Sequence, residues 1–135
     1  MLKSDPEAYS WDDLAREGGT TWDGVRNHQA RNNIEAMRPG DLCLIYHSVQ
    51  GTSVVGVARV TAAPAPDPTA DDPRWLAVTI APEYALALPV GLKLIKSDDA
   101  LKNMALVRQS RLSVMPVSPA EFKRIVALGG GRAPA

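Results

Sequence analysis

The sequence has only one cysteine among its 135 residues. A single thiol cannot form an internal disulfide, so core packing must hold the fold together, and we expect a reducing cytoplasm as the compartment. The cysteine stands inside the apolar run Leu42-Cys43-Leu44-Ile45, which predicts a small buried thiol rather than a reactive one. The two histidines lack the close Cys/His spacing of zinc sites, so we expect no metal.

Net charge is missing as well, because 15 Lys and Arg balance 15 Asp and Glu. This balance argues against a protein that binds nucleic acid through an overall positive charge. Any binding of nucleic acid must therefore rest on locally basic segments, here 24–34 and 102–113. The sequence has no run of about 18 apolar residues and no charged-then-apolar leader, so we expect no membrane span and no export. Glycine-rich phosphate loops are absent, and we expect no cofactor.

The segments that are present alternate irregularly between strand and helix signals, which predicts an α+β fold. The clearest local signals are two helix-capping motifs, Ser10 with Asp13 and Ser118 with Glu121. Residues 1–128 are expected to form one domain, and the glycines after it predict a flexible tail over 129–135. The predicted helices are Trp11–Glu17, 25–37 and Pro119–Leu128, the predicted strands are 41–47, 53–62, 74–81 (closed by Pro82) and 112–117, residues 64–73 are an exposed loop, and 89–96 are a strand or a short helix.

The segment 20–33 places Trp22 in a turn and then opens the long predicted helix. Ala30, Ile34 and Met37 would form one apolar stripe facing the core. Two interpretations stay open: a solvated helix above a buried Trp, or a binding surface beside an accessible one. The other faces of the helix carry groups that can read a planar polar ligand or a phosphate, namely Arg26, Asn27, Arg31 and Asn32.

The strand 41–47 leads into a polar cluster, Tyr46, His47 and Ser48. Neighbours on a strand point to opposite faces, so His47 and Ser48 are not expected to pair as base and nucleophile. Tyr46 and Ser48 share one face if the strand reaches that far, and a ring beside a hydroxyl would make a wall for a flat ligand. The alternative is that Tyr46 only covers the core.

Several ordered blocks of the sequence form one pattern, namely Lys3-Ser4-Asp5-Pro6, Thr21-Trp22-Asp23-Gly24-Val25-Arg26-Asn27 continuing through Gln29-Ala30-Arg31-Asn32, Gly40-Asp41, Tyr46-His47-Ser48, Val55-Gly56-Val57-Ala58 and Arg111-Leu112-Ser113-Val114. Together these blocks resemble the EVE domain family. The resemblance covers nearly the whole chain, from Leu2 to about Leu128, in the family's order. It implies a PUA-like fold, related to the YTH and ASCH domains, with a curved mixed sheet or pseudo-barrel flanked by helices. It also implies a pocket that takes a base, often a modified one such as methylated cytosine.

The same resemblance implies a role for each matching residue. Trp22 would be the aromatic wall of the pocket, and the start of the helix would supply hydrogen-bond donors. The polar cluster after the strand would line the far side, and the last strand would close the pocket. The implied base-binding residues are Lys3, Ser4, Trp22, Arg26, Asn27, Arg31, Tyr46, His47, Ser48, Arg111 and Ser113.

The chain departs from the family pattern at three places. It begins at Met1, where family members usually carry an aromatic residue before the Leu-Lys-Ser run, which predicts a shortened first strand. His28 stands where Tyr is common and would add a pH-dependent donor. Met115 replaces a commonly polar residue and is expected to pack in the core.

We therefore expect a non-catalytic, monomeric domain whose partner is DNA or RNA with a modified base. Two other function classes stay open. One is an RNA-cleaving enzyme of the ASCH type, in which His28, His47, Tyr46 and Lys3 would do acid-base work on a phosphodiester. The other is a protein-interaction module in which Trp22 and the Arg-rich helix bind another chain.

Overall fold

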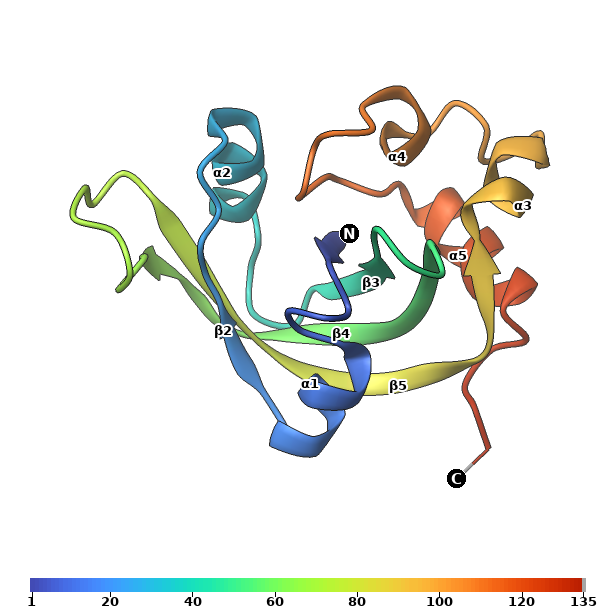
Figure 1. The fold of residues 1–135 in the computed structure, drawn as a ribbon, viewed down its shortest axis with the longest axis horizontal. Helices are drawn as coiled ribbons and strands as arrows, with labels where there is room; N and C mark the ends of the chain where they lie inside the picture. Colours follow the sequence, from blue (N-terminus) through green and yellow to red (C-terminus); the bar gives the residue numbers. More distant parts are fainter. Residues whose placement is uncertain (135) are drawn as a thin grey trace.

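A computed structural model describes residues 1–134, and its centre is one mixed sheet of five strands in the order β1-β3-β4-β5-β2. β1 pairs parallel with β3, and every other pairing is antiparallel. Figure 1 shows β4 and β5 as a long curved hairpin, with α2 near one end and α3 and α5 near the other. The predicted α+β class is confirmed, and the sheet is open rather than a closed barrel. The strands are Leu2–Ser4 (β1), Thr20–Trp22 (β2), Leu42–His47 (β3), Ser53–Pro66 (β4) and Leu76–Gly91 (β5).

The β4–β5 hairpin is longer than the sequence predicts. β4 runs on to Pro66, and β5 continues through Pro82, where we expected it to stop. Pro82 is paired with Ala58, next to one of four register shifts between the two strands. A bulge leaves a backbone position without a ladder hydrogen bond, so it tolerates proline, and it also bends and twists the strands. The register shifts near Pro82, where the sequence predicts the end of the strand, therefore also give the sheet its curvature.

The helices follow their capping signals. Both predicted capping boxes form, and they begin the two helices that agree with the prediction, α1 and α5. α2 is shorter than the predicted 25–37, because the side chain of Asn27 accepts from Ala30 N at 2.9 Å and starts the helix at His28. The predicted element 89–96 divides into the end of β5 and α3. The helices are Trp11–Glu17 (α1), His28–Glu35 (α2), Leu92–Ser97 (α3), Ala105–Arg108 (α4) and Pro119–Leu128 (α5).

The apolar stripe of α2 faces the core, as its spacing predicts. Ala30 and Ile34 are fully buried and Met37 is partly buried against the same cluster. Cys43 and Met115 are also buried, in agreement with the sequence. Within residues 1–134 no helix is long and apolar enough to cross a membrane.

The last predicted strand, 112–117, does not form. Val114 makes only an isolated antiparallel bridge with Leu2. A turn precedes it, in which Leu112 N donates to Gln109 O at 3.0 Å, and Pro116 follows without an N–H to continue a ladder. The segment still packs on the sheet, because Lys3 N donates to Ser113 O at 3.0 Å.

The glycine-rich end of the chain turns back along β5. Ala87 N donates to Gly131 O and Leu88 N donates to Gly129 O, both at 2.9 Å. The guanidinium of Arg132 lies 4.8 Å from the centre of the Tyr84 ring. Residues 129–133 therefore lie against β5, and Ala135, the last residue of the predicted flexible tail 129–135, lies outside the described residues.

Candidate functional site

Residues from both edge strands, β1 and β2, line a cleft of about 370 Å³. β1 and β2 lie at opposite ends of the strand order, and the curvature of the sheet lets both border one cavity. We call it the edge cleft. Of the predicted site residues it contains Lys3, Ser4 and Trp22. Its full lining is Lys3, Ser4, Asp5, Tyr9, Thr20, Thr21, Trp22 and Asp23.

Trp22 is the large aromatic wall of the edge cleft. It is the last residue of β2, paired with Val78, so its placement in a turn is wrong. The ring is half-buried, and Tyr9 packs against it edge to face, with centroids 6.0 Å apart and planes at 86°. Such a contact fixes the orientation of the indole. Tyr9 was not recognised from the sequence, because nothing local connects a tyrosine before α1 with a tryptophan after it.

Lys3 stands on the opposite wall. Its Nζ donates to Ser110 O at 2.7 Å and lies 5.8 Å from the centre of the Tyr46 ring. Partial burial lowers the pKa of the Lys3 amine. Ser4 Oγ donates to Tyr9 O at 2.6 Å, so this hydroxyl holds the turn that presents Tyr9.

The edge cleft also contains two carboxylates that the sequence analysis did not select, Asp5 and Asp23. Both stand inside the family blocks. A carboxylate repels a phosphate and accepts hydrogen bonds from an amino group, such as the exocyclic amine of cytosine. The cleft therefore suits a flat, nitrogen-rich group better than an anion.

The three residues predicted to line the far side are not part of the edge cleft. They contact residues of β1 and of α1 instead. Tyr46 is 2% exposed and belongs to the core. His47 Nε2 accepts from Trp11 N at 3.0 Å, at the start of α1. Burial lowers the pKa of His47, which favours the neutral ring that an accepting nitrogen requires. Ser48 N donates to Ser4 O at 2.8 Å and fixes the end of β1.

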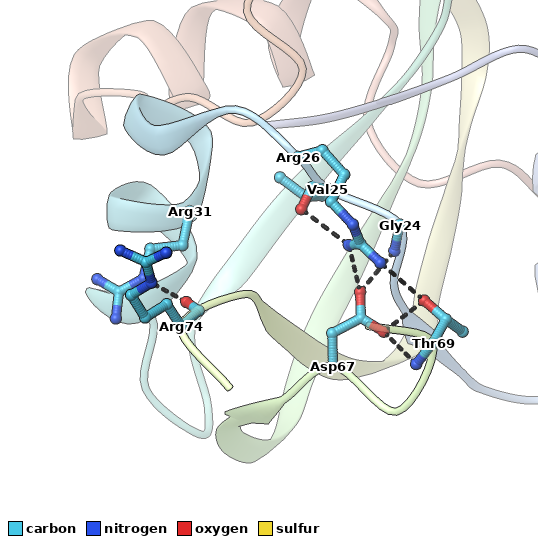
Figure 2. Close-up of polar contacts among 7 residues, drawn as sticks. All are labelled: Gly24, Val25, Arg26, Arg31, Asp67, Thr69 and Arg74. Carbon is cyan, nitrogen blue, oxygen red and sulfur yellow. Dashed lines mark hydrogen bonds and ion pairs between the residues drawn. The ribbon is translucent and has the colours of Figure 1, made fainter. Parts of the chain in front are cut away.

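Arg26 is not a free donor beside the cleft. Its guanidinium lies 2.9 Å from a carboxylate oxygen of Asp67 and donates to Thr69 Oγ1 at 3.2 Å (Figure 2). The Asp67 side chain is 0% exposed and also accepts from Gly24 N at 2.8 Å and from Thr69 N at 2.7 Å. Burial by itself would raise the pKa of Asp67, but the hydrogen bonds from Thr69, Arg26 and Gly24 hold it well below its usual range. Arg26 thus neutralises a buried charge.

Arg31 has a similar structural role on α2. Its Nε donates to Arg74 O at 2.8 Å (Figure 2). Its guanidinium also pairs with Glu35. His28 stacks on Trp75, with ring centroids 4.9 Å apart. Together these contacts hold the β4–β5 loop, residues 67–75, against the chain from Gly24 to α2. The exposed loop predicted at 64–73 is therefore wrong at Asp67, which is an anchor.

Asn27 and Arg111 line a second cleft, of about 380 Å³, which also includes Ser110, the residue whose carbonyl accepts from Lys3 Nζ. Ser113 lines neither of these two clefts, and its carbonyl accepts from Lys3 N at 3.0 Å. Within residues 1–134 no group of three or more His, Cys, Asp or Glu is arranged to hold a metal ion. The site is therefore built from the edge cleft, its supporting residues and the second cleft.

The curved mixed sheet, the flanking helices and the cleft between the sheet edges define a PUA-like domain. The chain belongs to the EVE domain family, whose sequence model matches residues 1–128. This match confirms the resemblance found in the sequence blocks.

Solved structures agree with this assignment. The crystal structure of an Agrobacterium tumefaciens protein superposes with a TM-score of 0.94 at 40% identity, covering 99% of this chain and 97% of that one. The crystal structure of human THYN1 in complex with 5-methylcytosine-containing DNA superposes with a TM-score of 0.88 at 29% identity, covering 95% of each chain. An ASCH protein of Zymomonas mobilis, at 13% identity and a TM-score of 0.58, shares the fold alone.

A relative in Schizosaccharomyces pombe, described as uncharacterized, is 35% identical over 123 residues. The match covers 78% of this chain and 52% of that protein, so the chain spans about half the length of this curated relative.

Proposed function

We propose that this domain binds nucleic acid and receives one base, a modified cytosine, in the edge cleft. The observation that carries the proposal is the Trp22 ring, half-buried and braced by Tyr9, opposite the Lys3 wall. A base removed from its stack needs an aromatic face and a few groups that read its edge. Asp5 and Asp23 offer acceptors for the amino group of cytosine.

The size of the cleft and the human structure support the same proposal. At about 370 Å³ it lies near the small end of ligand pockets, which run from roughly 300 to 1,000 Å³. Human THYN1, which shares the fold at 29% identity, was solved with DNA containing 5-methylcytosine. For this chain, the binding of a modified base, in DNA or in RNA, is part of the proposal.

We propose binding rather than catalysis. An acid-base mechanism would need the candidate residues at one place. His47 accepts from the backbone at α1, His28 stacks on Trp75, and Lys3 donates to Ser110 O. These three side chains have different partners. Tyr46, the fourth candidate, is buried in the core with the centre of its ring 5.8 Å from Lys3 Nζ.

The test is a titration of labelled oligonucleotides that differ at one base. Cytosine, 5-methylcytosine and 5-hydroxymethylcytosine are placed in the same sequence, as DNA and as RNA, at fixed salt. We expect a modified cytosine to bind more tightly than cytosine, and Trp22→Ala to remove that preference. Equal affinity for all bases in the wild type would overturn the assignment of a base pocket. Cleavage of the labelled strand during incubation would favour the enzyme class instead.

A further inference from the structure

The second cleft is lined by residues from the start of α2, from the end of α4 and from the segment that follows α4. Two arginines, Arg108 and Arg111, contribute to it, and both are exposed. We call it the arginine cleft. It is lined by Asn27, Gln29, Arg108, Gln109, Ser110, Arg111 and Leu112.

The charge of this cleft is unbalanced, although the whole chain is neutral. No Asp or Glu lines it, and in the part of the chain that the structure describes neither Arg108 nor Arg111 forms a salt bridge. Most of the other arginines form salt bridges with carboxylates. The arginines that form ion pairs are Arg16, Arg26, Arg31, Arg59, Arg74 and Arg124.

Three other side chains of the cleft carry amide donors. Gln29 and Gln109 carry amides, and Asn27 uses its oxygen to cap α2, which leaves its NH₂ group for a ligand. A guanidinium presents a planar set of N–H groups that matches a phosphate. Two unpaired guanidinium groups with amide donors and no acid between them are suited to an anion.

The position of the cleft indicates which anion. Ser110 belongs to the arginine cleft, and its carbonyl accepts from Lys3, which lines the edge cleft, at 2.7 Å. The linings of the two clefts are therefore in direct contact at Lys3 and Ser110. A strand with one base in the edge cleft would carry its adjoining phosphates toward Arg108 and Arg111.

We propose that the arginine cleft binds the phosphate backbone of the strand whose base enters the edge cleft. The proposal rests on the proposed function. It assigns base selection and phosphate binding to two different clefts. The edge cleft, with its carboxylates, selects the base, and the arginine cleft supplies affinity that is independent of sequence. The proposal also explains how a chain without net charge binds a polyanion, because the positive charge is concentrated in the arginine cleft.

The test compares two double variants that each remove two unpaired, exposed cations. Arg108→Gln/Arg111→Gln changes the cleft, and the matched control Lys93→Gln/Lys96→Gln changes α3. Dissociation constants are measured over a salt series with a single-stranded oligonucleotide carrying 5-methylcytosine and with its unmodified counterpart. Each phosphate contact contributes about 0.7 to the slope of log affinity against log salt. We expect the arginine variant to lower the slope by roughly 1.4, with the preference for the modified base unchanged. The lysine variant should keep the wild-type slope.

An abasic oligonucleotide separates this proposal from the base pocket. If the wild type shows no base preference, but binds the abasic strand through Arg108 and Arg111, the arginine cleft stands and the base pocket fails. If the base preference is present and the slope of the arginine variant equals that of the wild type, the phosphates lie elsewhere and the present proposal is overturned. No binding of any oligonucleotide at low salt would overturn both.

Discussion

The guanidinium of Arg26 lies 2.9 Å from the buried carboxylate of Asp67, which follows it by 41 positions. This contact closes the β4–β5 loop onto the segment between Trp22 and α2. Gly24 N donates to the same carboxylate at 2.8 Å, two residues after Trp22. Asp67 is thus a single anchor for both the loop and the chain that presents the aromatic wall.

Arg26→Ala should destabilise the domain, because it leaves Asp67 charged, buried and without its counter-ion. Losing one partner of a fully buried pair costs about 3–5 kcal/mol. Arg26 is 38% exposed and Asp67 keeps its bonds from Gly24 and Thr69, so we expect about 1–3 kcal/mol. Urea unfolding measures the change.

The matched control is Arg16→Ala, which breaks an ion pair to Asp13 with the arginine side chain 69% exposed. It should change the free energy of unfolding much less than Arg26→Ala does, because water screens an exposed ion pair. If both variants lose the same stability, the Arg26–Asp67 pair has no special role.

Acidification should weaken the same anchor. The pKa of Asp67 is depressed in the folded protein below its ordinary value of 3.8, so its contribution to stability is complete above that value and is lost as the pH falls below it. Asp67→Asn removes this titration. The difference in unfolding free energy between wild type and Asp67→Asn should stay constant from pH 7 to about 5 and shrink below about pH 4. A constant difference down to pH 3 would mean that the carboxylate is not stabilised in the fold.

Gly56→Ala should detach α1 from the sheet. A Cβ at Gly56 would lie 2.6 Å from ring carbons of Trp11, the first residue of α1. Overpacking of this kind costs about 1–3 kcal/mol. Gly91→Ala is the control, because a Cβ there meets nothing within 4 Å and the backbone is not left-handed. Thermal unfolding should separate the two variants, and equal stabilities would show that Trp11 can move aside.

Trp22→Ala should weaken oligonucleotide binding without unfolding the protein. Stacking of one base on an aromatic ring is worth about 1–3 kcal/mol, which corresponds to a loss of roughly five- to 150-fold in affinity. Trp22→Phe should retain part of the affinity. The control is Trp75→Ala, which removes an indole outside the edge cleft. Circular dichroism confirms folding before titration, and an unchanged affinity of Trp22→Ala would assign the ring to packing only.

The features that the sequence predicts well are those with short-range causes. The capping boxes at Ser10 and Ser118 lie within three residues of the groups they bond, so α1 and α5 could be located from the chain alone. The apolar stripe of α2 is another local signal, since helix geometry alone puts Ala30 and Ile34 on one face. The ordered blocks that resemble the EVE family likewise predicted the fold, because they can be read directly from the sequence.

The sequence by itself therefore determined the family, the α+β class and the central position of Trp22, but not the partners of the charged groups. An arginine is a ligand donor or an ion-pair partner depending on which carboxylate the fold places beside it. Only the tertiary structure brought Asp67 to Arg26 and, within residues 1–134, left Arg108 and Arg111 without a salt bridge around one cleft. The bulges that carry β5 past Pro82 likewise depend on the register with β4, and they bend the sheet until its two edges share a cleft. Such pairings join residues far apart in the chain, and no local propensity encodes them.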